Sequence, residues 1–289
     1  MAAAVAERAP GTLRWSSLVP YAVLALWTLP IIVLYVWLFY SSFFPRIEGF
    51  RPIGGFTFDN WRFLWDPQSV PQMRNRPAIL PLTLNTFIFS AMTSAVGLLI
   101  SSMAGYAFSR LRFKGRRLML GGVLLLHSFP SVTLLIALFI VLRTLGLYDK
   151  FVGVILVQTA FALPFGIWIM KGFFDNVPWD LEMSALVDGA GRFRTWLRIM
   201  LPLVKPGLLA LAVLLFVEGW NQFLLPFVFM PSGSQQTLST LVKGILGEGR
   251  FVDYGLLTAV GLYYIAPVLI LFVLAQDQLM RIYAGGVKG

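Results

Sequence analysis

The sequence predicts an all-α integral membrane protein with six transmembrane helices and both termini in the cytoplasm. Three observations lead to this prediction. Of the 289 residues, 58% are apolar and only 12% are charged, and the mean hydropathy is +0.78. A soluble domain of this size needs more polar surface than that. The apolar residues form long uninterrupted runs, and basic residues gather in the short segments between them.

The net charge of +10 does not indicate a nucleic-acid-binding protein, because the basic residues do not share one folded face. They lie between apolar spans, where membrane topology accounts for them. The chain has no cysteine, which excludes disulfides and cysteine metal sites.

The uncharged run from Trp15 to Pro45 is about twice as long as a signal-peptide core and lacks a small-residue cleavage site, so it is expected to stay as the first span. A transmembrane helix needs about 20 mainly apolar residues. Residues 46–76 are expected to form a loop that packs on the ends of the spans, and the alternative is a surface that contacts an external partner. The expected spans are residues 21–44, 84–108, 118–142, 151–170, 208–230 and 254–276.

Small residues recur at near-helical spacing along the second span, which predicts close packing against neighbouring helices. They are Ser90, Ser94, Gly97, Ser101 and Gly105.

Residues 110–117, RLRFKGRR, contain five basic residues and no acidic one. Such a cluster between two spans marks the cytoplasmic side of the membrane. Two spans later, the chain returns to the same side with residues 176–207, the longest interval that mixes many charges with apolar residues. We call residues 176–207 the coupling segment.

The coupling segment has the signals of two short helices. Asn176 is expected to cap the first helix, Pro178 fits its first turn, and the helix is expected to end at Val187, before Gly189. On the residues alone, two interpretations stay open: a hairpin on the membrane surface, or a helix that docks in a groove of another protein. The second helix is predicted to have one apolar face formed by Phe193, Trp196, Leu197 and Met200.

The stretches DLEMSALVDGAGRF and IMLPLVKPGL resemble the EAA loop of the permease subunits of bacterial ABC importers. The sugar-importer branch of maltose/maltodextrin type is the most similar, with further matches in YAFSRLRFKGRR, EGWNQFLLPFVF and YAGGVKG. The resemblance implies one ABC-importer transmembrane domain over residues 1–289, whose cytoplasmic coupling loop lies between the fourth and fifth helices. It assigns ATPase coupling to Glu182, Met183, Ser184, Ala185, Asp188, Gly189, Ala190, Ile199, Leu201 and Pro202.

The resemblance departs from the family pattern at one position. The first acidic residue of the family's motif corresponds to Met183, and Glu182 precedes it. Either Glu182 supplies the charge that pairs with the ATPase, or this contact has become apolar. Adjacent helical positions point about 100° apart, so one does not automatically replace the other.

The same resemblance implies a heterodimer with a companion permease subunit, an ATPase dimer, and a periplasmic or lipid-anchored solute-binding protein that delivers a saccharide. Membrane lipids of the bacterial inner membrane would surround the bundle. The chain has no G-x-x-x-x-G-K-[ST] motif, so it cannot supply a phosphate-binding loop itself. The resemblance therefore implies that the chain is not an enzyme and carries no cofactor. ATP and Mg are expected on the ATPase subunit.

The fifth span contains a polar face formed by Glu218 with Asn221 and Gln222 at i+3 and i+4, beside Trp220. An ionisable residue inside a span indicates function by default. These residues are expected to line a sugar pathway, and the alternative is hydrogen bonding between helices or to the companion subunit. The only histidine, His127, is expected to make a buried hydrogen bond instead of binding metal.

The resemblance implies two further contacts with partner proteins. The outward loop is expected to contact the binding protein, unless it is only a connector, through Ser232, Gly233, Ser234, Gln235 and Gln236. The tail is expected to enter the ATPase dimer interface, unless it is a frayed end, through Gly285, Gly286, Val287, Lys288 and Gly289.

Other cargoes and classes stay open at this point. The same architecture imports non-sugar solutes such as glycerol-phosphate compounds or polyamines, and the choice between neutral and acidic oligosaccharides is also open. A stand-alone secondary transporter or a membrane enzyme is a third interpretation. The first predicts inverted repeats and the second predicts clustered carboxylates and histidines, and the sequence displays neither.

Overall fold

A computed structural model describes residues 15–74, 76–232, 235–247 and 252–285, and it is mainly helical. The described residues form two compact units. One consists of the residues up to Trp61 together with Asp253–Leu262, and the other consists of Arg62–Val252 together with the residues from Tyr263 onward.

In the first unit, α1 (Trp15–Ser41) continues through Pro20 and Pro30. It ends three residues before the predicted boundary, because residues 42–44 leave the helix in a tight turn. A two-stranded antiparallel hairpin follows, formed by β1 (Arg46–Glu48) and β2 (Arg51–Ile53).

The segment after the hairpin folds back onto the end of α1. The side-chain amide of Asn60 donates to the carbonyls of Ser42 and Phe44 at 3.0 and 2.7 Å. The rings of Phe43 and Phe56 stack with centroids 5.0 Å apart. This confirms the prediction that the loop packs on the end of the first helix.

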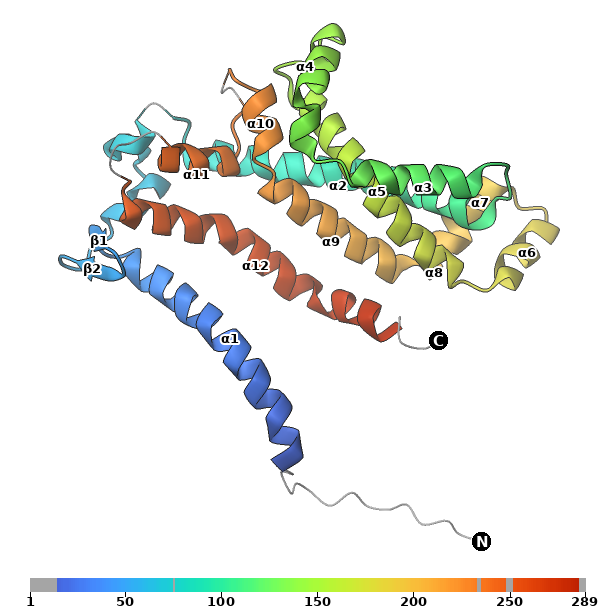
Figure 1. The fold of residues 1–289 in the computed structure, drawn as a ribbon, viewed down its shortest axis with the longest axis horizontal. Coiled ribbons are helices and arrows are strands. Elements are labelled where there is room, and N and C mark those ends of the chain that lie inside the picture. The colour runs from blue at the N-terminus through green and yellow to red at the C-terminus, as the bar shows by residue number, and fades with distance from the viewer. Residues whose placement is uncertain (1–14, 75, 233–234, 248–251, 286–289) are drawn as a thin grey trace. The chain divides into compact units, whose positions relative to one another are not determined.

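The second unit is built around α2 (Ile79–Arg110), which packs along α5 (Phe151–Asp175) and α9 (Lys205–Asn221) (Figure 1). The five small residues predicted to pack are all buried on α2. A Cβ atom at Gly105 would lie 2.7 Å from the Cβ of Met170, so only glycine allows this approach of α2 and α5. On the α9 side, a Cβ at Gly219 would lie 3.0 Å from the Cα of Ser90. Small residues thus set the distances between these helices.

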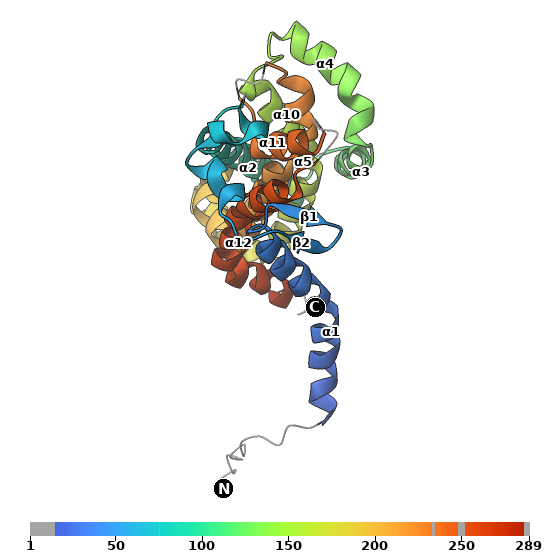
Figure 2. The same cartoon turned by 90° about the vertical axis from the view of Figure 1, so that its left-hand side faces the viewer.

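The predicted span 118–142 falls on two helices, α3 (Arg116–His127) and α4 (Leu135–Thr144), with a short 3₁₀ turn at Ser131–Leu134 between them. The two arms are bent by 94° (Figure 2). Pro130 lies at the break, where it has no N–H to donate and restricts the chain to an extended conformation.

The predicted span 208–230 also includes a break, because Gln222 is extended between α9 and α10 (Leu224–Phe229). Among the described residues, four helices are long and apolar enough to cross a membrane. The number rises to six if each of two bent pairs counts as one span, namely α3 with α4, and Arg192–Leu203 with α9. The remaining helices are α6 (Trp179–Val187), α7 (Arg192–Thr195), α8 (Leu201–Leu203), α11 (Leu238–Gly247) and α12 (Tyr254–Gly285).

Candidate functional site

The coupling segment consists of α6, a glycine turn, α7, a π-helical turn (Trp196–Met200) and α8, which leads into α9. Gly189 has φ +87°, a conformation that side-chain-bearing residues rarely adopt. The N–H groups of Gly189 and Ala190 donate to the carbonyls of Leu186 and Ala185 and so close the end of α6. The prediction of a helix that ends at Val187 before a glycine turn is confirmed.

The predicted cap of α6 is wrong. Asn176 ends α5, with φ −79° and ψ −9°, and does not begin α6. The residue before the first turn of α6 is Pro178, which provides no side-chain hydrogen bond.

The predicted single apolar face of the second helix is also wrong. Trp196 and Met200 are buried, whereas Phe193 and Leu197 are 65% and 47% exposed. The i→i+5 hydrogen bonding of the π-helical turn alters the angular step between side chains, so a face derived from 3.6-residue periodicity does not persist. The inward pair packs with Tyr106, Met170, Phe174 and neighbouring residues of α2 and α5.

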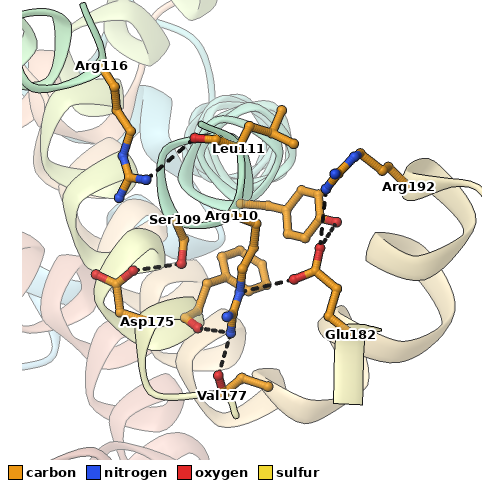
Figure 3. Close-up of polar contacts among 10 residues, drawn as sticks. Ser109, Arg110, Leu111, Arg116, Asp175, Val177, Glu182 and Arg192 are labelled. Atoms are coloured by element: carbon orange, nitrogen blue, oxygen red, sulfur yellow. Dashed lines mark hydrogen bonds and ion pairs between the residues drawn. The ribbon is translucent and has the colours of Figure 1, made fainter. Parts of the chain in front are cut away.

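A buried ion pair joins the coupling segment to the bundle (Figure 3). Arg110, the last residue of α2, has its Nε 3.3 Å from Oε2 of Glu182 on α6, and both side chains are buried. This contact is an ion pair without hydrogen-bond alignment, because neither atom makes a hydrogen bond. The hydroxyl of Tyr106 donates to Oε1 of Glu182 at 2.7 Å, and Arg192 approaches the same oxygen to 3.7 Å.

The guanidinium of Arg110 also closes the end of α5. Its Nη2 donates to the carbonyl of Phe174 at 2.6 Å and to that of Val177. A cation at a helix C-terminus is favoured by the helix dipole. The ring of Trp179 lies 4.7 Å from the guanidinium carbon. Arg110 therefore holds the ends of α2, α5 and the start of α6 together.

Glu182 and Met183, the two residues at the acidic positions of the family's motif, differ in their exposure. Glu182 is 0% exposed and its carboxylate has partners inside the chain, so it does not face outward. Met183 is 37% exposed and Val187 is 86% exposed. The surface of α6 that is open to a partner is therefore largely apolar.

The other residues of the motif are distributed over both sides of the coupling segment. Ser184, Asp188, Gly189 and Pro202 are exposed, Ala185 is buried, and Ala190, Ile199 and Leu201 are half-buried. The exposed and half-buried positions remain available to a partner.

A second candidate site is a cavity of about 680 Å³ lined by α3, α4, α5 and α9. Its polar lining includes Gln158, Glu218 and Gln222. The Gln158 side chain donates to Oε1 of Glu218 at 2.9 Å and accepts from Nε2 of Gln222 at 2.6 Å. The polar residues predicted on α9 are thus partly brought together, and Gln158 joins them from α5.

Two of the predicted pathway residues do not line this cavity. Trp220 is 1% exposed, and its Nε1 donates to the carbonyl of Tyr264 at 3.1 Å. Asn221 accepts from the Tyr264 hydroxyl at 3.1 Å. Both residues join α9 to α12 instead. No signal in the sequence predicted this role for Tyr264, which is one of many aromatic residues in apolar spans.

His127 is exposed at the end of α3, so the expected buried hydrogen bond is wrong. Its ring stacks on Phe165 with centroids 6.1 Å apart, and it lines the same cavity. Within the described residues, no group of three His, Cys, Asp or Glu side chains is placed to hold a metal.

The loop after α10, which is expected to contact the binding protein, begins beside the turn before α5. The backbone N–H and hydroxyl of Ser232 donate to Oδ1 of Asp149 at 3.3 and 2.9 Å. Gln235 is exposed, and the carbonyl of Gln236 accepts from Asn85 at 3.0 Å. Gly233 and Ser234 lie outside the described residues. Of the tail, Gly285 ends α12, while Gly286, Val287, Lys288 and Gly289 lie outside the described residues.

The family model of the binding-protein-dependent transport system inner membrane component matches residues 97–279. The trehalose transport system permease protein of Mycobacterium tuberculosis is 31% identical over 235 residues, which are 81% of this chain and 82% of that protein. The sulfoquinovosyl glycerol transport system permease protein of Agrobacterium fabrum is 34% identical over 206 residues, 71% of this chain and 72% of that protein.

Another relative is a diacetylchitobiose uptake system permease protein of Streptomyces coelicolor, 31% identical over 277 residues, 95% of this chain and 90% of that protein. Among solved structures, a bacterial ABC transporter involved in the import of the acidic polysaccharide alginate matches with a TM-score of 0.72 and 22% identity. The match covers 93% of this chain and 99% of that chain, so the two share a fold.

Proposed function

The chain belongs to the binding-protein-dependent transport system inner membrane components, and from this premise we propose that it forms, with a companion permease subunit, the pathway of an imported saccharide. The protein is a multi-pass inner-membrane permease subunit of an ABC importer. The three relatives described above are named for the transport of trehalose, of sulfoquinovosyl glycerol and of diacetylchitobiose, which supports a saccharide cargo.

We further propose six transmembrane helices with both termini in the cytoplasm, which is compatible with the four to six candidate spans. The spans would be α1, α2, the bent pair α3 and α4, α5, α9 continued by α10, and α12. The basic cluster at residues 110–117 favours the cytoplasm for the connection between α2 and α3. The coupling segment then lies on the same side, within reach of a cytoplasmic ATPase.

The main support for the proposal is that α6 of the coupling segment has one exposed apolar side and one side fixed to the bundle. Its α6 presents exposed Met183 and Val187 outward, and its inward side is held by the pair of Arg110 and Glu182. An exposed apolar helix face fits a groove of a partner. A buried ion pair behind that face keeps α6 attached to the bundle when the partner moves.

Mechanically, closure of the ATPase dimer around ATP and Mg would displace α6. Because Arg110 also holds the end of α5, this displacement reaches the helix that carries Gln158. The cavity lined by Gln158, Glu218 and Gln222 would then change shape, which is the expected alternation between inward-facing and outward-facing states. ATP hydrolysis itself belongs to the separate ATPase subunit.

The polar lining of the cavity suits a saccharide. A carboxylate accepts hydrogen bonds from sugar hydroxyl groups, and a side-chain amide both accepts and donates them. A binding protein would deliver the saccharide on the outer side, and in the proposed topology Ser232, Gln235 and Gln236, on the loop before α11, would face it.

The test is reconstitution of the full importer, with its companion subunit and ATPase, in proteoliposomes. Binding proteins loaded with neutral oligosaccharides, acidic oligosaccharides, a polyamine or a glycerol-phosphate compound are added in turn, and ATPase stimulation is measured. We expect stimulation by a saccharide-loaded binding protein. Stimulation by the amine or the glycerol-phosphate compound alone would refute the saccharide cargo but leave the importer assignment in place.

A further inference from the structure

We propose that the cytoplasmic connection between α2 and α3 is a binding site for an anionic phospholipid, with a headgroup pocket at residues 112–117 and an acyl-chain groove along α5 and α9. This site is separate from the saccharide cavity and from the coupling surface of α6.

The headgroup pocket has a volume of about 920 Å³. Its charged lining is entirely basic and consists of Arg112, Lys114, Arg116, Arg117 and Lys171. Topology alone requires basic residues on this side of the membrane, but it does not require them to surround one pocket.

The basic residues of this connection differ in how they are paired. Arg110 is buried and its charge is balanced by Glu182, and Arg116 donates to the carbonyl of Leu111 at 3.4 Å (Figure 3). Within the part of the chain that the structure describes, Arg112, Lys114 and Arg117 have no ion pair or hydrogen bond. Three exposed cations therefore remain available to an anionic ligand.

Lys171 is partly neutralised, because its ammonium pairs with Asp175 one turn further along α5. Asp175 also accepts from the hydroxyl of Ser109 at 2.6 Å. This carboxylate lines the acyl-chain groove and not the headgroup pocket, so it does not remove the excess of positive charge within the headgroup pocket.

The start of α3 adds backbone donors to the pocket. Gly115 precedes the helix in a left-handed conformation, with φ +84°, and no side chain caps the first turn. Uncapped N–H groups at a helix N-terminus attract anions, and here they lie among the four basic residues of the connection.

An apolar groove adjoins the basic pocket, and this is why we infer a lipid and not a free anion. The groove has a volume of about 530 Å³ and shares Leu120 and Lys171 with the headgroup pocket. It is lined mainly by apolar side chains such as Trp168 and Leu214. A basic pocket that continues into an apolar groove matches a molecule with an anionic head and a hydrocarbon chain.

The position of Trp168 agrees with this arrangement. It precedes Lys171 by three residues on α5, so the two side chains lie on one side of that helix, and the indole is 54% exposed. Tryptophan favours the level of lipid headgroups, and basic side chains beside it attract anionic lipids.

In the test, the assembled importer is placed in nanodiscs that contain phosphatidylcholine with or without phosphatidylglycerol, and it is then purified from them. Retained phosphatidylglycerol is measured by mass spectrometry. The triple variant Arg112→Gln/Lys114→Gln/Arg117→Gln should retain about tenfold less of it, or even less. A control with the same change of charge, Arg46→Gln/Arg51→Gln/Lys150→Gln, removes basic residues elsewhere and should retain the wild-type amount.

A charge-conserving variant and a competition experiment with phosphate complete the test. The charge-conserving variant Arg112→Lys/Arg117→Lys should retain the lipid, which separates charge from folding. An excess of inorganic phosphate should not displace the lipid, because phosphate has no acyl chain. Equal retention by the triple variant and the wild-type protein, or complete displacement by phosphate, would overturn the proposal.

The acyl-chain groove is tested separately with a photo-crosslinking amino acid in place of Leu214 in the intact complex. We expect an adduct whose mass corresponds to a phospholipid. An adduct with the companion permease subunit would show that a protein covers this groove, and it would refute the lipid site.

Discussion

The Nε atom of Arg110 lies 3.3 Å from Oε2 of Glu182, and the two side chains are 1% and 0% exposed. This buried pair joins the end of α2 to the helix that presents the candidate coupling surface. Glu182 is therefore a structural support of α6, and the surface itself is formed by its exposed neighbours Met183 and Val187.

Replacing Glu182 by Gln is expected to loosen the coupling segment. The change leaves the cation of Arg110 buried without its counter-charge, which costs about 3 kcal/mol in comparable cases. Limited proteolysis of the coupling segment should become faster, and ATPase activity should lose its dependence on the loaded binding protein. Arg192→Gln is the matched control, because Arg192 is 53% exposed and 3.7 Å away, so its loss should cost less than about 1 kcal/mol.

Substitutions at Gly189 and at Gly191 should show which of the two glycines the turn requires. Gly189 has φ +87°, whereas Gly191 has φ −67°, and no atom lies within 4 Å of a Cβ built at either position. Gly189→Ala should destabilise the turn by about 1–2 kcal/mol, and Gly191→Ala should not.

Gly189→Pro should abolish coupled transport without preventing membrane insertion, because proline holds φ near −65°. Transport in proteoliposomes and membrane fractionation provide the two measurements. Wild-type coupling in Gly189→Pro would contradict a role for this turn.

The exposed surface of α6 can be mapped because the chain has no native cysteine. Val187→Cys should react with a membrane-impermeant maleimide from the cytoplasmic side and should be protected when the ATPase subunit is bound. Ser232→Cys should react from the outer side, with or without the ATPase. Labelling of both residues from the same side would contradict the proposed topology.

Disrupting the hydrogen bonds that line the cavity should impair transport without changing the coupling to the ATPase. Gln158→Leu removes the group that joins Glu218 to Gln222, so the two side chains lose their shared partner. Saccharide uptake should fall several-fold while ATPase activity without binding protein stays unchanged. Asn221→Leu is the control, since Asn221 faces Tyr264 and not the cavity. An equal loss of uptake in both variants would argue against a pathway role for the cavity.

Helix packing provides a stability prediction. Gly105→Ala places a methyl group 2.7 Å from the Cβ of Met170 and 2.9 Å from the backbone nitrogen of Lys171. Overpacking of this kind costs about 1–3 kcal/mol. Gly121→Ala, also within a helix, meets no atom within 4 Å and should leave stability unchanged or raise it by up to about 1 kcal/mol. Thermal unfolding in detergent should separate the two variants.

Local patterns in the sequence predicted the apolar spans, the end of α6 and the protein family. Long apolar runs predict spans because a helix must satisfy its backbone hydrogen bonds inside the membrane. The end of α6 at Val187 and the turn at Gly189 also follow from neighbouring residues. The motif in the coupling segment indicated an ABC-importer permease, and the family match agrees.

Tertiary structure decided which way the individual side chains face. The sequence contains no signal that Glu182 meets Arg110, because the partners are distant in the chain and the phase of a short helix does not show which side the bundle covers. For the same reason, Trp220 was predicted beside the pathway but lies buried against α12. A proline in a span is compatible with a kink or a full break, and only packing around Pro130 determines the 94° bend. Local patterns thus determine that apolar helices form and where α6 ends, whereas long-range packing determines where spans break and which residues become a site.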